Sequence, residues 1–183
     1  MPLYFAYGSN MDRGAMAARC PGSRPLGRAR LPRHRLVIMQ EGYASVVQDP
    51  RREVWGIVWD VPFADIPALD RYEEVASGLY RKAQQSVLTA AGPRRALVYL
   101  GRNGGPGRPR PDYMENVVAA AREAGLPDTY LRELMGWLPA GPGRQMGGTP
   151  PAPEPRLRPA VRPTRASPRD PPVDRNANWS WDL

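Results

Sequence analysis

The chain has 183 residues, which is enough for one domain with a full hydrophobic core and a modest appendage. Its single cysteine and single histidine exclude an internal disulfide and a thiolate metal site, and no segment reaches the length of an apolar membrane span. The formal net charge of +8 is spread along the chain and carried by arginine with a single lysine, which indicates genome composition rather than a nucleic-acid site. We therefore expect a soluble cytoplasmic protein that does not contact a membrane and for which nucleic acid is a disfavoured partner.

Proline divides the chain into two parts. Of the 23 prolines, eleven fall within residues 139–183, where hydrophobic periodicity also disappears. A segment of this composition cannot build a packed core and favours extended or disordered backbone. The sequence therefore predicts a globular domain over residues 1–138 and a largely disordered Pro/Arg-rich tail over residues 139–183, whose partner is unknown.

The first predicted element is a short buried strand that begins at Leu3 and ends in the polar loop Tyr7-Gly8-Ser9-Asn10. Such a loop can direct successive backbone N–H groups, the Ser9 hydroxyl and the Asn10 amide at one point outside the strand end. A group of donors arranged in this way suits an anion or a developing oxyanion. The alternative is an ordinary turn.

The next elements are a short helix, which is expected to carry no chemistry, a basic segment and two strands. A short helix is predicted over residues 12–20, with Asp12 as its N-cap. Residues 24–35 are basic and have the composition of turns, and strands are predicted over residues 36–39 and 44–48.

A hairpin turn is expected at Asp49-Pro50-Arg51-Arg52, leading into a strand over Glu53–Val61. This strand is apolar on both faces, because Val54 and Val58 alternate with Ile57 and Trp59. Strands buried on both sides occur within closed or well-covered sheets. The pattern therefore predicts a central strand.

A helix is predicted from Asp65, which can act as its N-cap, to Glu74. Ile66, Leu69 and Glu73 are spaced at i, i+3 and i+7, which puts the carboxyl group of Glu73 on the apolar face. Two other acidic residues of this helix, Asp70 and Glu74, project to either side of this face.

An ionised carboxylate on a buried face is costly, so the pKa of Glu73 is expected to lie above its ordinary value. A raised pKa is what a general base working near neutral pH needs. Two alternatives stay open from the spacing: Glu73 pairs with Arg71 or Arg81, or the helix ends sooner.

The remainder of the domain is expected to form two strands, a connector and two helices. Their ranges are 80–88, 95–100, 101–111, 112–124 and 127–138. The glycine-rich connector lacks the Lys-Ser/Thr pair of a phosphate-binding loop. Tyr113, in the first turn of its helix, can point its hydroxyl across a pocket mouth or simply pack.

Two separated elements, Tyr7-Gly8-Ser9-Asn10 and Leu69-Asp70-Arg71-Tyr72-Glu73, together resemble the gamma-glutamyl cyclotransferase-like family. Its members carry Tyr-Gly-Ser-Asn near the N-terminus and a catalytic Glu in a Leu-Asp-x-x-Glu context. The resemblance covers residues 3 to about 137 and excludes the tail. Weaker agreement follows in the same order at Gly42-x-Ala44-Ser45, Val54–Trp59, Ser77–Tyr80, Pro111–Tyr113 and Gly125–Pro127.

This resemblance implies an α+β fold, a small closed mixed β-barrel with packed helices, and a cavity between the first loop and Glu73. It also implies an acyltransferase or lyase without metal or organic cofactor, which releases 5-oxoproline from a gamma-glutamyl amine, amino acid or peptide. The substrate's own α-amine would attack its γ-carbonyl, with Glu73 as general base and acid. The substrate would be bound by Tyr7, Gly8, Ser9 and Asn10 and bordered by Tyr80 and Tyr113.

The sequence departs from the family pattern at Glu74, where many relatives have Gly, and at Glu41, where some have a second Gly. Both departures bear on the identity of the substrate. Three rival functions remain: a serine hydrolase using Ser9, with His34 as its only possible histidine base; a non-catalytic binding module of the same fold; and an arginine-rich nucleic-acid binder.

Overall fold

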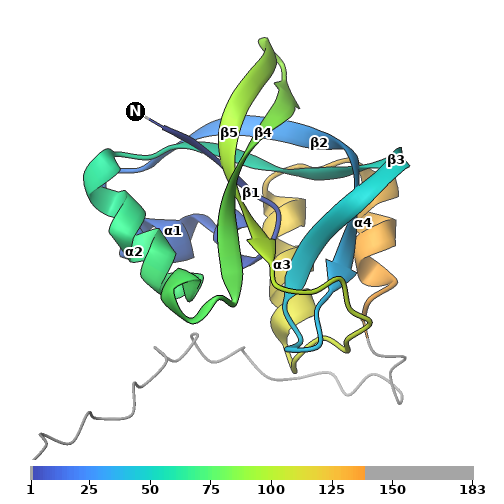
Figure 1. Cartoon of the computed structure of the whole chain (residues 1–183). Helices are drawn as coiled ribbons and strands as arrows, with labels where there is room; N and C mark the ends of the chain where they lie inside the picture. Colours follow the sequence, from blue (N-terminus) through green and yellow to red (C-terminus); the bar gives the residue numbers. More distant parts are fainter. Residues whose placement is uncertain (1, 139–183) are drawn as a thin grey trace, which may run out of the picture. The chain divides into compact units, whose positions relative to one another are not determined.

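Five strands close into a barrel in the computed structural model of the chain, which describes residues 2–138 (Figure 1). Around the barrel the strands follow the order β1-β3-β2-β4-β5. Neighbours are antiparallel except for β1 and β5, which are parallel and close the sheet. The strands are β1 (Leu3–Ala6), β2 (Arg24–Ile38), β3 (Ala44–Asp60), β4 (Tyr80–Thr89) and β5 (Gly92–Gly101). The predicted closed mixed barrel is confirmed.

Helices pack on two sides of this barrel. In Figure 1, α1 and α2 lie on one side and α3 and α4 on the other. The α-helices are α1 (Arg13–Arg19), α2 (Ile66–Tyr72), α3 (Tyr113–Glu123) and α4 (Asp128–Met135), and the 3-10 turns are η1 (Ser9–Met11), η2 (Phe63–Asp65) and η3 (Val75–Ser77). None of the helices within residues 2–138 is long and apolar enough to cross a membrane.

Strand β3 is the central strand that its sequence predicts. It pairs with β1 on one edge and with β2 on the other. Val54 and Val58 are buried on one face, and Ile57 and Trp59 are buried on the opposite face. Both faces of β3 therefore lie in the core, which explains the unbroken apolar run.

The prediction of turns over residues 24–35 is wrong, because this segment is most of strand β2. Ala29 and Leu31 are buried, whereas Arg28 and Arg30, which alternate with them, are not. The period of two that defines a half-buried strand is therefore present, with arginine in the outward positions. Pro32 lies beside a shift in register, where a missing N–H is tolerated.

The predicted hairpin at residues 49–52 is also wrong, since β3 runs through it without reversing. The local turn chemistry is present: the Arg51 N–H donates to Asp49 Oδ1 over 3.1 Å. It produces a bulge instead of a hairpin, because the register of β2 and β3 shifts across this segment and Arg33 takes a positive φ of 59°.

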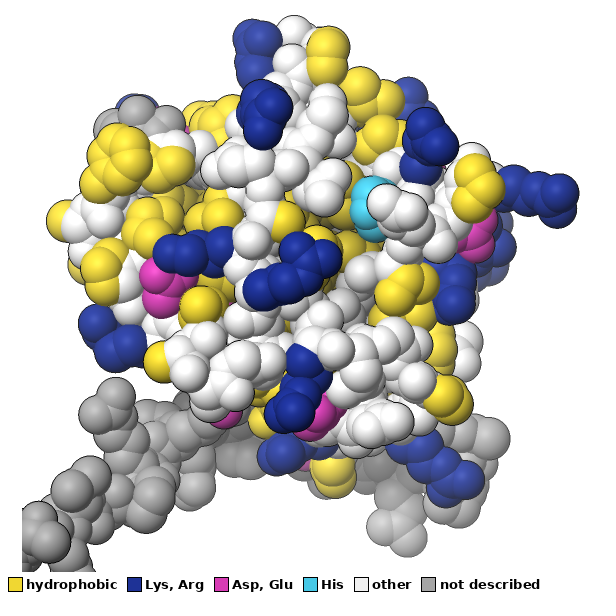
Figure 2. Space-filling view, viewed as in Figure 1, with side chains coloured by type: hydrophobic (Ala, Val, Ile, Leu, Met, Phe, Trp, Pro, Cys, Tyr) yellow, Lys and Arg dark blue, Asp and Glu magenta, His cyan; other side chains and the backbone are white. Residues whose placement is uncertain are grey.

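Basic side chains are scattered over the face shown in Figure 2, among hydrophobic and neutral ones. Several are held by acidic partners at the surface, such as Arg24 with Asp60 at 3.0 Å and Arg52 with Glu133 at 2.8 Å. This distribution agrees with a charge spread along the sequence. The domain boundary after residue 138 and the disorder of residues 139–183 fall outside the described residues and stay predictions.

Candidate active site

The loop after β1 turns inward and buries Asn10, whose side chain is 2% exposed. It forms the single 3-10 turn η1, with Gly8 at its N-terminus. A Cβ added at Gly8 would lie 3.1 Å from the Tyr113 hydroxyl, so a side chain there would crowd Tyr113. The loop is therefore packed into the domain, unlike an ordinary surface turn.

The Asn10 side chain joins this loop to Glu73. Its Nδ2 donates to Glu73 Oε1 over 2.8 Å and to the Tyr4 hydroxyl over 2.9 Å. On the other side, Arg19 Nη1 donates to Asn10 Oδ1. Because a guanidinium can only donate, it orients the amide with its oxygen toward Arg19 and its NH₂ group toward Glu73.

Glu73 is not on the helix that was predicted to carry it. Helix α2 ends at Tyr72, and Glu73 is the half-buried residue that follows, with φ −79° and ψ 1°. Its N–H still donates to Leu69 O over 2.8 Å, so it keeps the direction of the last turn. The alternative in which the helix ends sooner is therefore right.

The start of α2 also differs from the prediction. Asp65 occupies the N-cap position but makes no side-chain cap. Its Oδ2 accepts the Gly22 N–H over 3.0 Å, which ties the segment before α2 to the chain after α1.

Three tyrosines named from the sequence surround the same carboxylate. Burial raises the pKa of Tyr7, Tyr80 and Tyr113, and the charge of Glu73 raises each of them further. The Tyr80 hydroxyl donates to Ala44 O over 2.6 Å, and the Tyr113 hydroxyl accepts the Ala44 N–H over 3.1 Å. All three tyrosines therefore lie within electrostatic reach of Glu73.

Sequence reasoning missed Arg19 and Tyr72. The helix over residues 12–20 was expected to carry no chemistry, yet it brings Arg19 to the loop that holds Asn10. Besides its bond to Asn10, the Arg19 guanidinium lies 3.4 Å from the centroid of the Tyr72 ring. The Tyr72 hydroxyl is 2.9 Å from Ser9 Oγ. Arg19 in α1 and Tyr72 in α2 therefore both contact the loop that follows β1.

Tyr4 was also missed, although a signal for it existed. A tyrosine in a buried strand needs a hydrogen-bond partner for its hydroxyl, and Asn10 supplies it. No comparable signal points to Arg19, because its neighbours depend on how α1 packs.

The serine-hydrolase alternative does not fit these contacts. Ser9 Oγ pairs with the Tyr72 hydroxyl, while His34 Nδ1 lies 2.8 Å from Pro32 O in strand β2. The described hydrogen bonds thus leave Ser9 without a histidine base. Within residues 2–138, no three His, Cys, Asp or Glu side chains gather closely enough to hold a metal ion.

Known proteins share this arrangement of strands and sequence. The model of the AIG2-like family matches residues 53–134. Mouse gamma-glutamylcyclotransferase is 35% identical over 143 residues, covering 72% of this chain and 76% of the mouse protein. The chain belongs to the gamma-glutamylcyclotransferase family. The human protein of that name is 33% identical with the same coverage.

A solved structure named gamma-glutamyl cyclotransferase agrees with this assignment. It superposes with a TM-score of 0.71 at 30% identity, over 80% of this chain and 93% of its own. The family resemblance predicted from the sequence is thus confirmed. The roles of individual site residues and the cavity beside Glu73 stay predictions.

Glu41, one of the two departures from the pattern of the gamma-glutamylcyclotransferase family, holds the connector that follows β5. Its Oε2 accepts from Asn103 Nδ2 over 2.8 Å, and this hydrogen bond lowers the pKa of Glu41. Its backbone carbonyl accepts from Arg110 Nε over 3.0 Å. Glu41 therefore anchors the glycine-rich connector to the turn between β2 and β3.

Glu74, the other departure, has the left-handed conformation that favours glycine, with φ 52° and ψ 44°. We expect Glu74→Gly to raise the free energy of unfolding by roughly 0.5–1 kcal/mol, because relief of left-handed strain exceeds the extra chain entropy of glycine. Urea unfolding curves measure this change. Gly78→Glu, which puts the same side chain on another left-handed residue with open space around it, should lower stability by a similar amount. A Glu74→Gly variant that is less stable than the unmodified chain would contradict the expected backbone strain at Glu74.

The buried hydroxyls and thiol predict a pH dependence of stability in this member of the gamma-glutamylcyclotransferase family. Burial raises the pKa of Cys20 from 9.0 to about 11, and it raises the pKa values of Tyr4, Tyr7 and Tyr80 above 10.0. The unfolded chain releases these protons at pH 9–10, whereas the folded chain keeps them. The contribution to stability is therefore complete below pH 9 and is lost as pH rises further, by about 1.4 kcal/mol per group and pH unit.

Denaturant midpoints measured between about pH 8 and pH 11 check this expectation. The midpoint should fall with rising pH, and tyrosinate absorbance should appear together with unfolding. Ionisation of these tyrosines near pH 10 in a chain that keeps its native circular dichroism would contradict it.

Proposed function

We propose that this chain is a cyclotransferase that releases 5-oxoproline from a gamma-glutamyl amine, amino acid or peptide, with Glu73 as general base and acid. The observation that carries the proposal is the 2.8 Å contact between Asn10 Nδ2 and Glu73 Oε1, which joins the donor-rich loop and the carboxylate in one site. The names of the mouse and human relatives support it.

The proposed reaction needs no nucleophile from the protein. Glu73 takes a proton from the α-ammonium group of the substrate, and the freed amine attacks the substrate's own γ-carbonyl carbon. A five-membered ring closes as the carbonyl oxygen becomes an oxyanion. When the C–N bond to the departing amine breaks, Glu73 returns its proton to that amine, and the carboxylate is regenerated. A second proton passes from the ring nitrogen to the departing amine, so that 5-oxoproline keeps one N–H and the amine leaves as an ammonium ion.

Asn10 and Arg19 prepare the carboxylate for this cycle. The Asn10 NH₂ group donates to Glu73 Oε1 and so holds the carboxylate in place. Arg19 maintains the direction of the amide through Asn10 Oδ1. We therefore assign Arg19 a positioning role.

The oxyanion and the glutamyl carboxylate need hydrogen-bond donors. No side chain caps the N-terminus of η1, so the first backbone N–H groups of the loop are candidates. Tyr113 is another: its hydroxyl accepts from the Ala44 N–H, and within residues 2–138 no group accepts its proton. By contrast, the Tyr7 hydroxyl donates to Tyr99 O, and the Tyr80 hydroxyl donates to Ala44 O. These two tyrosines therefore suit a role in the wall of the site.

The test is a substrate panel with the full chain. It contains gamma-glutamyl amino acids, gamma-glutamyl amines and glutathione, and 5-oxoproline is measured by mass spectrometry. We expect turnover of at least one class without added metal or cofactor. Glutathione should be disfavoured, because Glu74 adds an exposed carboxylate beside Glu73. Absence of turnover across the panel would favour the non-catalytic binding module instead.

A further inference from the structure

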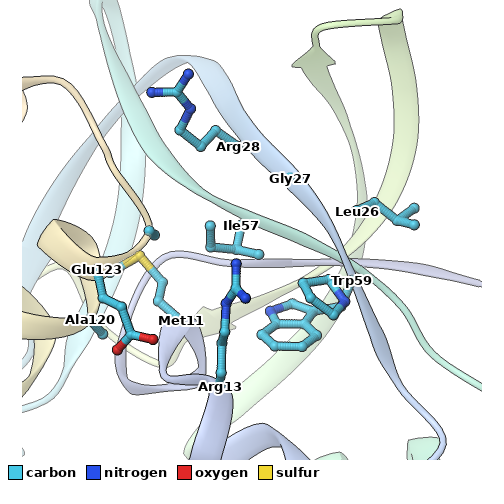
Figure 3. Close-up of a pocket in the computed structure, with 11 residues that line it drawn as sticks. Met11, Arg13, Leu26, Gly27, Arg28, Ile57, Trp59, Ala120 and Glu123 are labelled. Carbon is cyan, nitrogen blue, oxygen red and sulfur yellow. The ribbon is translucent and has the colours of Figure 1, made fainter.

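A cavity of about 260 Å³ lies at the N-terminal end of β2, and neither Glu73 nor a tyrosine is among the residues that line it (Figure 3). Its walls come from the beginning of α1, the paired strands β2 and β3, and the end of α3. The lining residues are Met11, Arg13, Pro25, Leu26, Gly27, Arg28, Ile57, Trp59, Ala120, Glu123 and Ala124. Since drug-sized ligands occupy about 300–1,000 Å³, this volume suits a molecule of the size of one amino acid.

Two opposite charges line this cavity without a partner. Arg13 comes from the first turn of α1 and Glu123 from the last turn of α3. Neither side chain makes an ion pair or hydrogen bond within the described part of the chain, and Figure 3 shows them on different walls. Arg28 is different, because its Nη1 donates to Gly125 O and its guanidinium points away from Arg13.

A buried donor in the same wall also lacks an acceptor. The Trp59 side chain is 2% exposed, and its Nε1–H has no hydrogen-bond partner among residues 2–138. Buried N–H groups are almost always paired, so an unpaired one indicates a missing acceptor. Arg13 extends alongside Trp59 in Figure 3, whereas the side chain of Leu26, which is 57% exposed, points away from both.

We propose that this cavity binds a free α-amino acid. The carboxylate of the amino acid accepts from Arg13 and, once the wall around the buried indole shifts, from Trp59 Nε1–H, while its ammonium group donates to Glu123. An apolar side chain packs on Met11 and Ile57. Arg13 and Glu123 are exposed, so solvent satisfies both charges in the free protein. A zwitterion pairs with both charges, whereas a simple anion would lie beside the like charge of Glu123 and an apolar ligand would pair with neither.

The test is a titration of the full-length, ¹⁵N-labelled protein with leucine, methionine and glutamate up to about 10 mM, followed by the indole N–H resonances. Trp59→Phe identifies the Trp59 resonance. We expect saturable binding of an apolar amino acid, with the Trp59 signal moving downfield. Arg13→Gln should weaken binding about tenfold, as loss of a hydrogen bond to a charged group predicts. The control Arg122→Gln, one residue before Glu123 and outside the cavity, should leave binding unchanged.

Trp59→Phe separates a ligand site from a structural role of the indole. It should weaken binding, because it removes a donor to the ligand carboxylate, and the chain should stay folded at a modest cost in stability, because Phe fills less of the buried space than the indole does. Absence of binding by every amino acid would overturn the proposal. Binding that survives Arg13→Gln but is lost in Glu73→Gln would also overturn it, because the amino acid would then occupy the proposed active site. The proposal does not depend on catalysis, so an inactive protein that binds leucine here would still support it.

Discussion

Glu73→Gln is expected to lower the rate of 5-oxoproline release by a factor of about 10²–10⁴ while leaving the domain folded. That range is the usual contribution of one general acid–base group. The substitution removes the negative charge and, with it, the ability to take and return a proton. Glutamine has the same shape, and its amide oxygen can still accept from Asn10 Nδ2, the 2.8 Å contact that holds Glu73 in place.

The measurement is the turnover number on the best substrate of the panel, together with the thermal unfolding midpoint of each variant. Glu74→Gln is the matched control, because it removes a neighbouring charge from an exposed side chain. It should change turnover little. If Glu73→Gln keeps most of the activity and Glu74→Gln loses it, the assignment of the general base is wrong.

Asn10→Ala is not an equivalent test of the same idea. It would remove the donor to Glu73, leave the Tyr4 hydroxyl unpaired and free Arg19 at once. A loss of activity would then have several physical causes. The single atom changed in Glu73→Gln keeps the interpretation narrow.

The parts of the fold that the sequence predicts are those with a strong local signal. Strand β3 shows its double-sided burial in the alternation of Val54, Ile57, Val58 and Trp59. The α3 and α4 helices show their apolar stripes. The first part of strand β2, residues 24–35, was not predicted as a strand. Its outward positions are arginines, and it contains Pro25 and Pro32, which suggest turns. Both prolines lie beside register shifts, where pairing is interrupted anyway.

The residues of the candidate site also divide into those that the sequence predicts and those that it does not. Tyr7, Asn10 and Glu73 belong to two short motifs that stand out in the sequence. Arg19 does not, because its role depends on α1 placing it between Asn10 and the Tyr72 ring. Glu73 was expected on the apolar face of a helix. It instead follows the last helical residue, because Glu74, the next residue along the chain, has a left-handed conformation that a helix cannot contain. Spacing along a helix cannot predict a conformation that ends it.

Gly56→Ala is expected to destabilise the domain by about 3 kcal/mol or more, the upper range for overpacking a core. Gly56 lies in β3, where β1 packs against it. A Cβ added there would come within 2.1 Å of Ala6 O and 2.9 Å of the Phe5 ring. Carbon atoms do not approach a backbone oxygen so closely, so β1 must move away from β3.

This displacement should also reach the active site, because Ala6 is the last residue of β1 and directly precedes the loop with Ser9 and Asn10. Urea unfolding measures the loss of stability, and turnover measures the loss of loop position. Gly14→Ala is the control: it makes the same substitution in α1, where the nearest atom is 3.4 Å away, and should stabilise the helix by about 0.5 kcal/mol. If Gly56→Ala is as stable as the unmodified chain, then β1 does not pack on β3 at this point, and the anchoring of the loop by the barrel fails with it.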